Sequence, residues 1–206
     1  MAPYLQSVSS FVDVPVADAG VDTVEFLKAA EGLAGIFDLL GGIAFKAVKS
    51  DLTGNIEKVR KRYEAAREKS TTLELLVQNE KVDKQNTATD GLMWLLRGFA
   101  FTCKALQIAQ ENKTIELKAA FQKSYADTLG KHHTFLMKPA FTLALNACPY
   151  RAVFYEELAK DPNGVSTLSQ DALGEELDKW LAALAAIVKR LQAFYEGLGI
   201  KNPIQF

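Results

Sequence analysis

Apolar residues recur every three or four positions along most of the chain, and this spacing predicts amphipathic helices. The stretch between Pro15 and Pro139 contains no proline, so long helices can form there without a break. Glycine pairs and polar clusters separate the periodic segments. We therefore predict helices over residues 22–40, 44–69, 71–84, 87 or 89 to 111, 114–129, 132–147, 150–160 and 169–198.

These segments predict an all-α fold. No segment of useful length alternates apolar and polar residues as a strand does, and no repeat or low-complexity segment is present. A chain of 206 residues is within the range of one domain. We predict a single domain over residues 1–206, with about eight helices in packed layers. Residues 1–21 precede the first predicted helix, and we expect them to be loosely ordered.

The composition excludes several classes of function. The formal net charge of -1 gives no electrostatic reason to expect a nucleic acid as partner. The two cysteines, Cys103 and Cys148, lack neighbours at metal-ligand spacing, so we expect reduced thiols, no metal and no other cofactor. No run of about 18 apolar residues and no secretory signal is present. We expect a cytoplasmic monomer whose membrane contact is peripheral.

A polar stripe stands out on the second predicted helix. Asp51, Asn55 and Lys58 follow one another at i, i+4 and i+7, which places a carboxylate, an amide and an ammonium on one face. Such a stripe is most often solvated surface. Its functional interpretation is a row of donors and acceptors at fixed separations, which suits the hydroxyls of a sugar.

The fourth predicted helix places Trp94 one turn before Gly98. A tryptophan at helical spacing is more often core than site. A glycine in mid-helix costs about 1 kcal/mol relative to alanine, which indicates that another group approaches closely there. A flat indole beside a gap could stack on the apolar face of a pyranose ring.

The sixth predicted helix begins with a polar residue on an otherwise apolar face. His133 is followed at steps of four by Met137, Phe141 and Leu145. The histidine is either a satisfied core residue or the one polar anchor of an apolar channel. The adjacent face carries Phe135 and Lys138, and an aromatic ring beside a cation suits a membrane interface.

Together, these segments resemble the glycolipid transfer protein family, and its fungal members most closely. The resemblance covers residues 24–160 and is carried by the stretch 48–58, by the stretch 93–98, and by His133 with Pro149-Tyr150 sixteen residues later. It implies two helical layers that enclose a lipid tunnel. It also implies a protein that binds and transfers glycosphingolipids without catalysing a reaction.

The resemblance assigns roles to particular residues. Asp51, Asn55, Lys58 and Trp94 correspond to the residues that bind the sugar headgroup, and Asp51 and His133 to those that bind the ceramide amide. Phe135 corresponds to the family's membrane-facing aromatic, with Lys138 on the same face. The implied tunnel residues are Phe37, Leu40, Phe45, Val48, Phe141, Ala144 and Leu145.

Three other functions compete with this one. A carrier of phosphorylated ceramide is expected to have arginines where this chain has Trp94 and Gly98, so the sequence favours a neutral sugar. A lipid-sensing interaction module is not distinguished from a carrier by sequence. An enzyme using Asp51 and His133 is disfavoured, because no nucleophile motif or phosphate loop accompanies them. The chain also departs from the family at Asn146 and in the segment 201–206, where better-known members have tyrosines.

Overall fold

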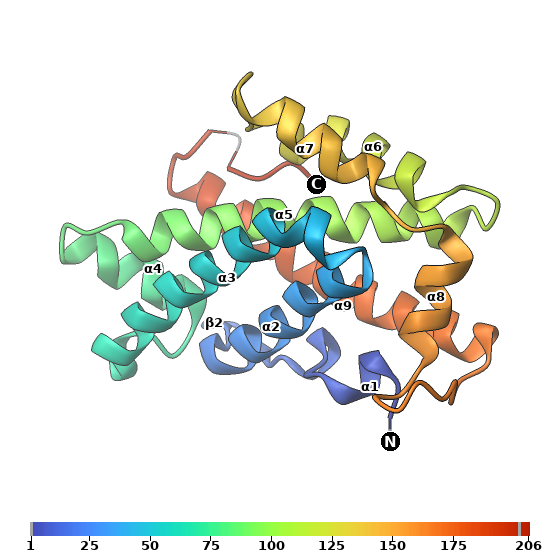
Figure 1. Ribbon diagram of the computed structural model, residues 1–206. Helices are drawn as coiled ribbons and strands as arrows, with labels where there is room; N and C mark the ends of the chain where they lie inside the picture. The colour runs from blue at the N-terminus through green and yellow to red at the C-terminus, as the bar shows by residue number, and fades with distance from the viewer. Residues whose placement is uncertain (1, 202) are drawn as a thin grey trace.

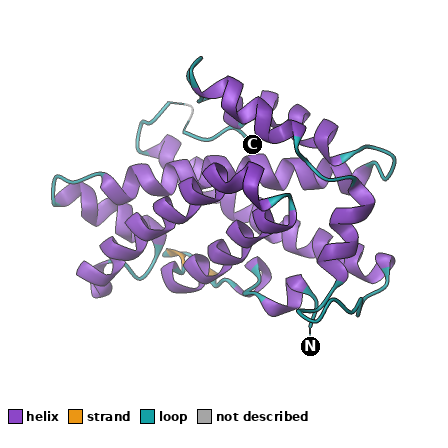
Figure 2. Cartoon of the chain, viewed as in Figure 1, coloured by secondary structure: helices purple, strands orange, loops and turns teal. Residues whose placement is uncertain are grey.

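The computed structural model describes residues 2–201 and 203–206, and its regular secondary structure is almost entirely helical (Figures 1 and 2). Two two-residue strands, β1 (Val16–Ala17) and β2 (Gly20–Val21), form a small antiparallel hairpin. The α-helices are α1 (Tyr4–Ser7), α2 (Thr23–Leu39), α3 (Gly42–Ala65), α4 (Leu73–Val82), α5 (Thr87–Glu111), α6 (Leu117–Asp127), α7 (Met137–Asn146), α8 (Arg151–Ala159) and α9 (Gln170–Gly197). The 3₁₀ turns are η1 (Phe11–Asp13), η2 (Arg67–Lys69) and η3 (Leu129–Lys131). The predicted all-α class is confirmed.

The predicted helices are all present, and α7 differs most from its predicted bounds. It begins at Met137 and not at residue 132. Pro139 explains the later start, because a proline lacks an N–H and is tolerated in the first turn of a helix but not in its interior. Residues 132–136 therefore form a turn that leads into the helix.

Helix α5 begins with a cap that local sequence did not predict. Its N-cap residue is Asn86. The buried carboxylate of Glu80, from α4, accepts hydrogen bonds from the backbone N–H groups of Ala88 and Thr89 at 2.8 and 2.6 Å. A carboxylate at this position satisfies free N–H groups and complements the helix dipole.

The expectation of a loosely ordered N-terminal segment is wrong for the described residues. Phe11 is 1% exposed, and its ring packs edge-on against Phe26, Phe99 and Trp180 at centroid distances of 5.0–6.2 Å. Leu5 is also buried. This segment is held by long-range burial of apolar side chains, which helical periodicity does not reveal.

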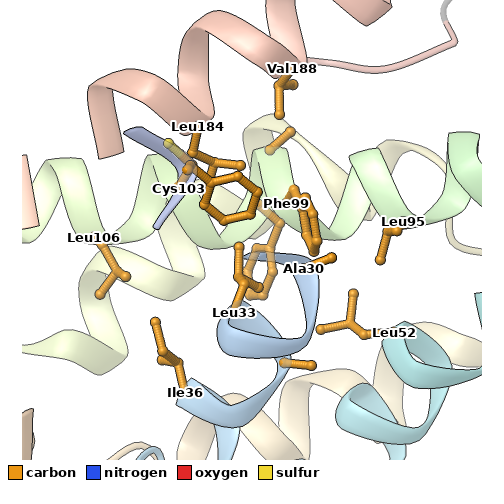
Figure 3. Packing of buried hydrophobic residues seen from close by; sticks show 14 of the residues in the cluster. Ala30, Leu33, Ile36, Leu52, Leu95, Phe99, Cys103, Leu106, Leu184 and Val188 are labelled. Atoms are coloured by element: carbon orange, nitrogen blue, oxygen red, sulfur yellow. The ribbon is translucent and has the colours of Figure 1, made fainter. Parts of the chain in front are cut away.

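Helix α5 runs through the middle of the molecule, and α3, α4, α6 and α9 pack against it (Figure 1). Helix α3 crosses it on one side with α2 beside α3, α9 packs along another side, and α6 and α7 lie above it (Figure 1). Figure 3 shows how the apolar faces of α2, α3, α5 and α9 meet. Its labelled core side chains are Ala30, Leu33 and Ile36 of α2, Leu52 of α3, Leu95, Phe99, Cys103 and Leu106 of α5, and Leu184 and Val188 of α9.

Two glycines of α5 allow α3 to approach closely. A Cβ atom at Gly98 would lie 2.7 Å from Cδ2 of Leu52, and one at Gly91 would lie 3.1 Å from Cβ of Lys58. The glycine in mid-helix predicted that another group approaches α5 closely, and that group is the side chain of Leu52. The space beside Gly98 is occupied on that side by the core, and a larger residue there would push α3 away.

We predict that Gly98→Val lowers the free energy of unfolding by about 1–3 kcal/mol, because an added branched side chain overpacks the contact with Leu52. Gly54→Val is the matched control, since no atom lies within 4 Å of the Cβ position there and glycine is the poorer helix former. Urea unfolding of both variants measures the difference. Equal stabilities would show that the close approach is not needed.

Candidate functional site

The polar stripe of α3 forms a hydrogen-bonded row. Asn55 donates from Nδ2 to Oδ2 of Asp51 at 3.3 Å, and Lys58 donates from Nζ to Oδ1 of Asn55 at 2.9 Å. Asn55 is only 2% exposed, whereas Asp51 and Lys58 reach the surface. The helical spacing read from the sequence produces this row directly. One amide thus holds the two charged groups on either side of it in place.

Trp94 lies on α5, opposite this row. Its indole is half-buried, and the guanidinium carbon of Arg97 lies 4.5 Å from the ring centroid, within cation–π range. Arg97 also donates from Nε to the backbone oxygen of Pro203 at 2.7 Å. The C-terminal segment is therefore tied to the side chain that packs against the indole.

His133 reaches the same region from outside any helix. The sequence predicted it on a helix face, but it lies in the turn between η3 and α7. Its ring is 6.3 Å from the indole of Trp94 and 5.1 Å from the ring of Phe141, and its Nδ1 is 2.9 Å from the hydroxyl of Tyr125. Tertiary contacts therefore bring it to the apolar face of α7.

These groups line one cavity of about 410 Å³, within the range of small-molecule sites. Charged and polar side chains stand on one part of its wall, and apolar side chains form the rest. The lining residues are Ala44, Ala47, Val48, Asp51, Leu52, Asn55, Lys58, Trp94, Gly98, Leu129, His133, Met137, Ala140, Phe141 and Ala144. The cavity can thus take a ligand with a hydrogen-bonding end and an apolar body.

Burial sets the charge of the titratable groups. It raises the pKa of the Asp51 carboxyl above its ordinary value, although Lys58, His133 and the bond from Asn55 act in the opposite direction. Burial also lowers the pKa of His133, against the attraction of Asp51. Burial together with Arg97 lowers the pKa of His132 to about 4. Both imidazoles are therefore neutral near neutral pH, and each can donate from one nitrogen and accept at the other.

Comparisons with known proteins show the family of this chain. The family model described as "Glycolipid transfer protein (GLTP)" matches residues 21–160. The chain belongs to the glycolipid transfer protein family. It is 46% identical to the glycolipid transfer protein of Aureobasidium melanogenum over 185 residues, which cover 90% of this chain and 88% of that protein.

Solved structures of the family show the same fold. The chain is similar to HET-C2, a fungal glycolipid transfer protein, with a TM-score of 0.86, 45% identity, and coverage of 94% of this chain and 96% of the other. It is also similar to the GLTP-fold structure of FAPP2, which selects simple glycosphingolipids, with a TM-score of 0.86, 29% identity, and coverage of 97% of both chains. The chain also shares its fold with the human ceramide-1-phosphate transfer protein, whose structure was solved with its lipid. The TM-score is 0.82 at 16% identity, and the match covers 97% of this chain and 98% of the other.

The structure separates the tunnel residues that the resemblance implied into two groups. Val48, Phe141 and Ala144 line the cavity. The other four, which lie in the core at 0 or 1% exposure, are Phe37, Leu40, Phe45 and Leu145. The ring of Phe37 packs on that of Phe45 at a centroid distance of 5.7 Å. These four side chains therefore do not line the cavity.

Sequence reasoning missed several cavity residues. Ala44 and Ala47 continue the polar stripe of α3 toward its N-terminal end, so extending the same helical spacing could have found them. Ala140 continues the apolar face of α7 in the same way. Tyr125 and His132 gave no local signal, because they reach the site through tertiary contacts only.

The outer face of α7 and the turn before it is rich in exposed apolar side chains. Phe135 is 78% exposed, and Lys138 beside it is exposed as well. The structure adds Leu136 and Leu143, each 73% exposed, which sequence analysis did not single out. Apolar groups gathered on one exposed element indicate a contact surface.

The described residues, which leave out positions 1 and 202, contain no group of three or more His, Cys, Asp or Glu side chains that could hold a metal ion. Among the same residues, no helix is both long enough and apolar enough to cross a bilayer.

We predict that Asp51→Asn leaves the unfolding free energy at pH 7 unchanged or raises it. The raised pKa means that the folded protein disfavours the ionised carboxylate relative to the unfolded chain. Any advantage of the variant should be largest above the folded-state pKa. It should shrink as the pH falls through that pKa and be absent below the ordinary value of an aspartate. Urea unfolding across this pH range tests this, and a clear loss of stability at pH 7 would contradict it.

Proposed function

We propose that this protein binds a glycosphingolipid and carries it between membranes in the cytoplasm as a monomer, without catalysing a reaction. The observation that carries the proposal is the row of Asp51, Asn55 and Lys58 at the polar side of an otherwise apolar cavity. Membership of the family and the 46% identity to a fungal glycolipid transfer protein support it.

The headgroup would lie against α3 and α5. Asp51 accepts hydrogen bonds from sugar hydroxyls, Lys58 donates them, and Asn55 can do both. The indole of Trp94 offers its face to the apolar side of the sugar ring. Because apolar burial discriminates poorly among lipids, selection falls to these groups, where a buried polar atom left unpaired costs about 1–3 kcal/mol.

The ceramide amide would lie between Asp51 and His133. The carboxylate can accept from the amide N–H, and the neutral imidazole can donate to the amide oxygen. The two side chains line the same cavity and influence each other's pKa, which supports a shared ligand.

The hydrocarbon chains would enter the apolar part of the cavity. Exposing one sixteen-carbon chain to water costs about 12 kcal/mol, so a carrier accelerates transfer by replacing water with apolar side chains. The core residues behind the cavity, Phe37, Leu40, Phe45 and Leu145, would have to separate to admit the chains. Of the residues of α7, only Ala144 and Leu145 are buried, so α7 can move with less loss than α3 or α5.

A phosphorylated ceramide fits this site less well. The chain has Trp94 and Gly98 where a carrier of phosphorylated ceramide is expected to have arginines, so neither position offers a guanidinium to a phosphate. The negative charge of Asp51 would also repel a phosphate. A neutral sugar is therefore the proposed headgroup.

The exposed side chains of α7 and of the turn before it would rest on the membrane surface. Phe135, Leu136 and Leu143 can enter the interface, and Lys138 can remain at the level of the headgroups. Because the inner face of the same helix lines the cavity, the lipid would have a short path between bilayer and cavity.

We predict that Trp94→Ala lowers the affinity for a short-chain galactosylceramide by at least about tenfold, since the aromatic contact is lost. The melting temperature should change little, because the indole is only partly buried. Binding is measured by calorimetry, and transfer is measured between vesicles. An unchanged affinity in a folded variant would contradict the stacking role.

Tryptophan fluorescence offers a matched test, because the chain has two tryptophans and only one is in the cavity. Trp180 is 2% exposed and packs on Phe11 in the core. Emission should respond to glycolipid in Trp180→Phe, which retains Trp94, and should not respond in Trp94→Phe. The reverse pattern would place the ligand elsewhere.

We predict that Phe135→Ala weakens binding to vesicles by about tenfold, since the ring removes apolar area from water at the interface. Affinity for the soluble short-chain lipid should not change. Val82→Ala is the control, because Val82 is 77% exposed at the end of α4, which lies away from α7 (Figure 1). Vesicle sedimentation compares the three proteins, and equal loss in the soluble assay would place Phe135 at the ligand site.

A further inference from the structure

Tyr125 is buried behind His133 and contacts it directly. It lies near the end of α6, is 9% exposed, and places its hydroxyl 2.9 Å from Nδ1 of the histidine. Its ring stacks on Phe141 with the centroids 4.5 Å apart and the planes 13° from parallel. The ring contact fixes where the hydroxyl points.

The hydroxyl proton is best placed toward the histidine. Within residues 2–201 and 203–206, Nδ1 of His133 is the only hydrogen-bond partner of the Tyr125 hydroxyl. If Nδ1 carried a proton and donated to the tyrosine, the hydroxyl proton would have no acceptor in the protein, and a buried donor without an acceptor is costly. Burial raises the pKa of Tyr125, so the hydroxyl keeps its proton.

The direction of this hydrogen bond determines whether the other ring nitrogen of His133 carries a proton. A neutral imidazole that accepts at Nδ1 carries its proton on Nε2. Asp51 stands in the same cavity and attracts positive charge on His133. An N–H directed into a cavity that holds a carboxylate is acceptable there, so Asp51 does not oppose the tautomer that Tyr125 selects.

We propose that Tyr125 is a positioning residue that holds His133 in the tautomer protonated on Nε2. The histidine then presents a donor to the amide oxygen of the lipid, while Asp51 presents an acceptor to the amide N–H. The two groups together match the polarity of an amide, and an imidazole in the other tautomer would oppose the amide oxygen with a lone pair. This inference rests on the proposed function.

Nitrogen NMR of the ligand-free protein tests the tautomer directly. The chain contains two histidines, so ¹⁵N-histidine labelling reports on two imidazoles with two ring nitrogens each, and His132→Gln assigns them. In the wild type near neutral pH, His133 should show a protonated Nε2 and an unprotonated Nδ1. In Tyr125→Phe, which keeps the ring that packs on Phe141, the two tautomers should mix. A protonated Nδ1 in the wild type, or the same tautomer in the variant, would overturn the proposal.

Binding shows whether the tautomer matters to the ligand. Tyr125→Phe should bind short-chain galactosylceramide about fivefold more weakly, the loss expected for one hydrogen bond. A galactosyl dialkyl ether lipid of matched chain length has no amide oxygen, and its affinity should be the same for both proteins. An equal loss with the ether lipid would reduce Tyr125 to a structural role and overturn the proposal.

The control variant is Tyr155→Phe. Tyr155 is also buried, its hydroxyl donates to Oε1 of Gln110 at 2.8 Å, and it does not line the cavity. It should change neither the His133 signals nor the affinities. Failure of the wild type to bind any glycolipid would reject the proposed function, whereas the NMR result on the free protein decides the role of Tyr125 separately.

Discussion

The close approach of α3 and α5 is the constraint on which the site depends. Gly91 and Gly98 present no side chains to α3, so Lys58 and Leu52 lie almost against the backbone of α5. This contact places the polar row of α3 and the indole of Trp94 on the walls of one cavity. Any larger side chain at the two glycines would widen the separation and the cavity with it. Glycines in mid-helix lower the stability of α5, but they allow the close approach of α3 that gives the site its geometry.

The site also holds polar groups that the folded protein does not fully satisfy. Burial raises the pKa of Asp51 even with Lys58 and Asn55 beside it, so its carboxylate is held in a position that favours protonation. A ligand that donates a hydrogen bond to this carboxylate relieves part of that cost. Specificity and stability thus oppose each other at Asp51, as is common at binding sites, and the apolar core formed by α2, α5 and α9 supplies the stability (Figure 3).

Helix α7 combines two roles because it is packed on one side only. Its inner face contributes Phe141 and Ala144 to the cavity, while Leu143 and the preceding Phe135 are exposed. Few buried contacts hold it, which makes local opening less costly there than at α5 or α9. A lipid carrier needs such an element, since the ligand must pass between the bilayer and the interior without crossing water.

The sequence alone determined the helices and the row of Asp51, Asn55 and Lys58, because both follow from spacing within one helix, which is a local property of the backbone. The resemblance added the fold and the assignment of Trp94 and His133. Tertiary structure decided the rest. The N-terminal segment is ordered because Phe11 is buried in the core, and Leu52 packs against Gly98. His133 lies in a turn, and its contact with the hydroxyl of Tyr125 forms only in the folded structure. These contacts join residues on different elements, so their energies depend on packing between helices, which no pattern within one segment encodes.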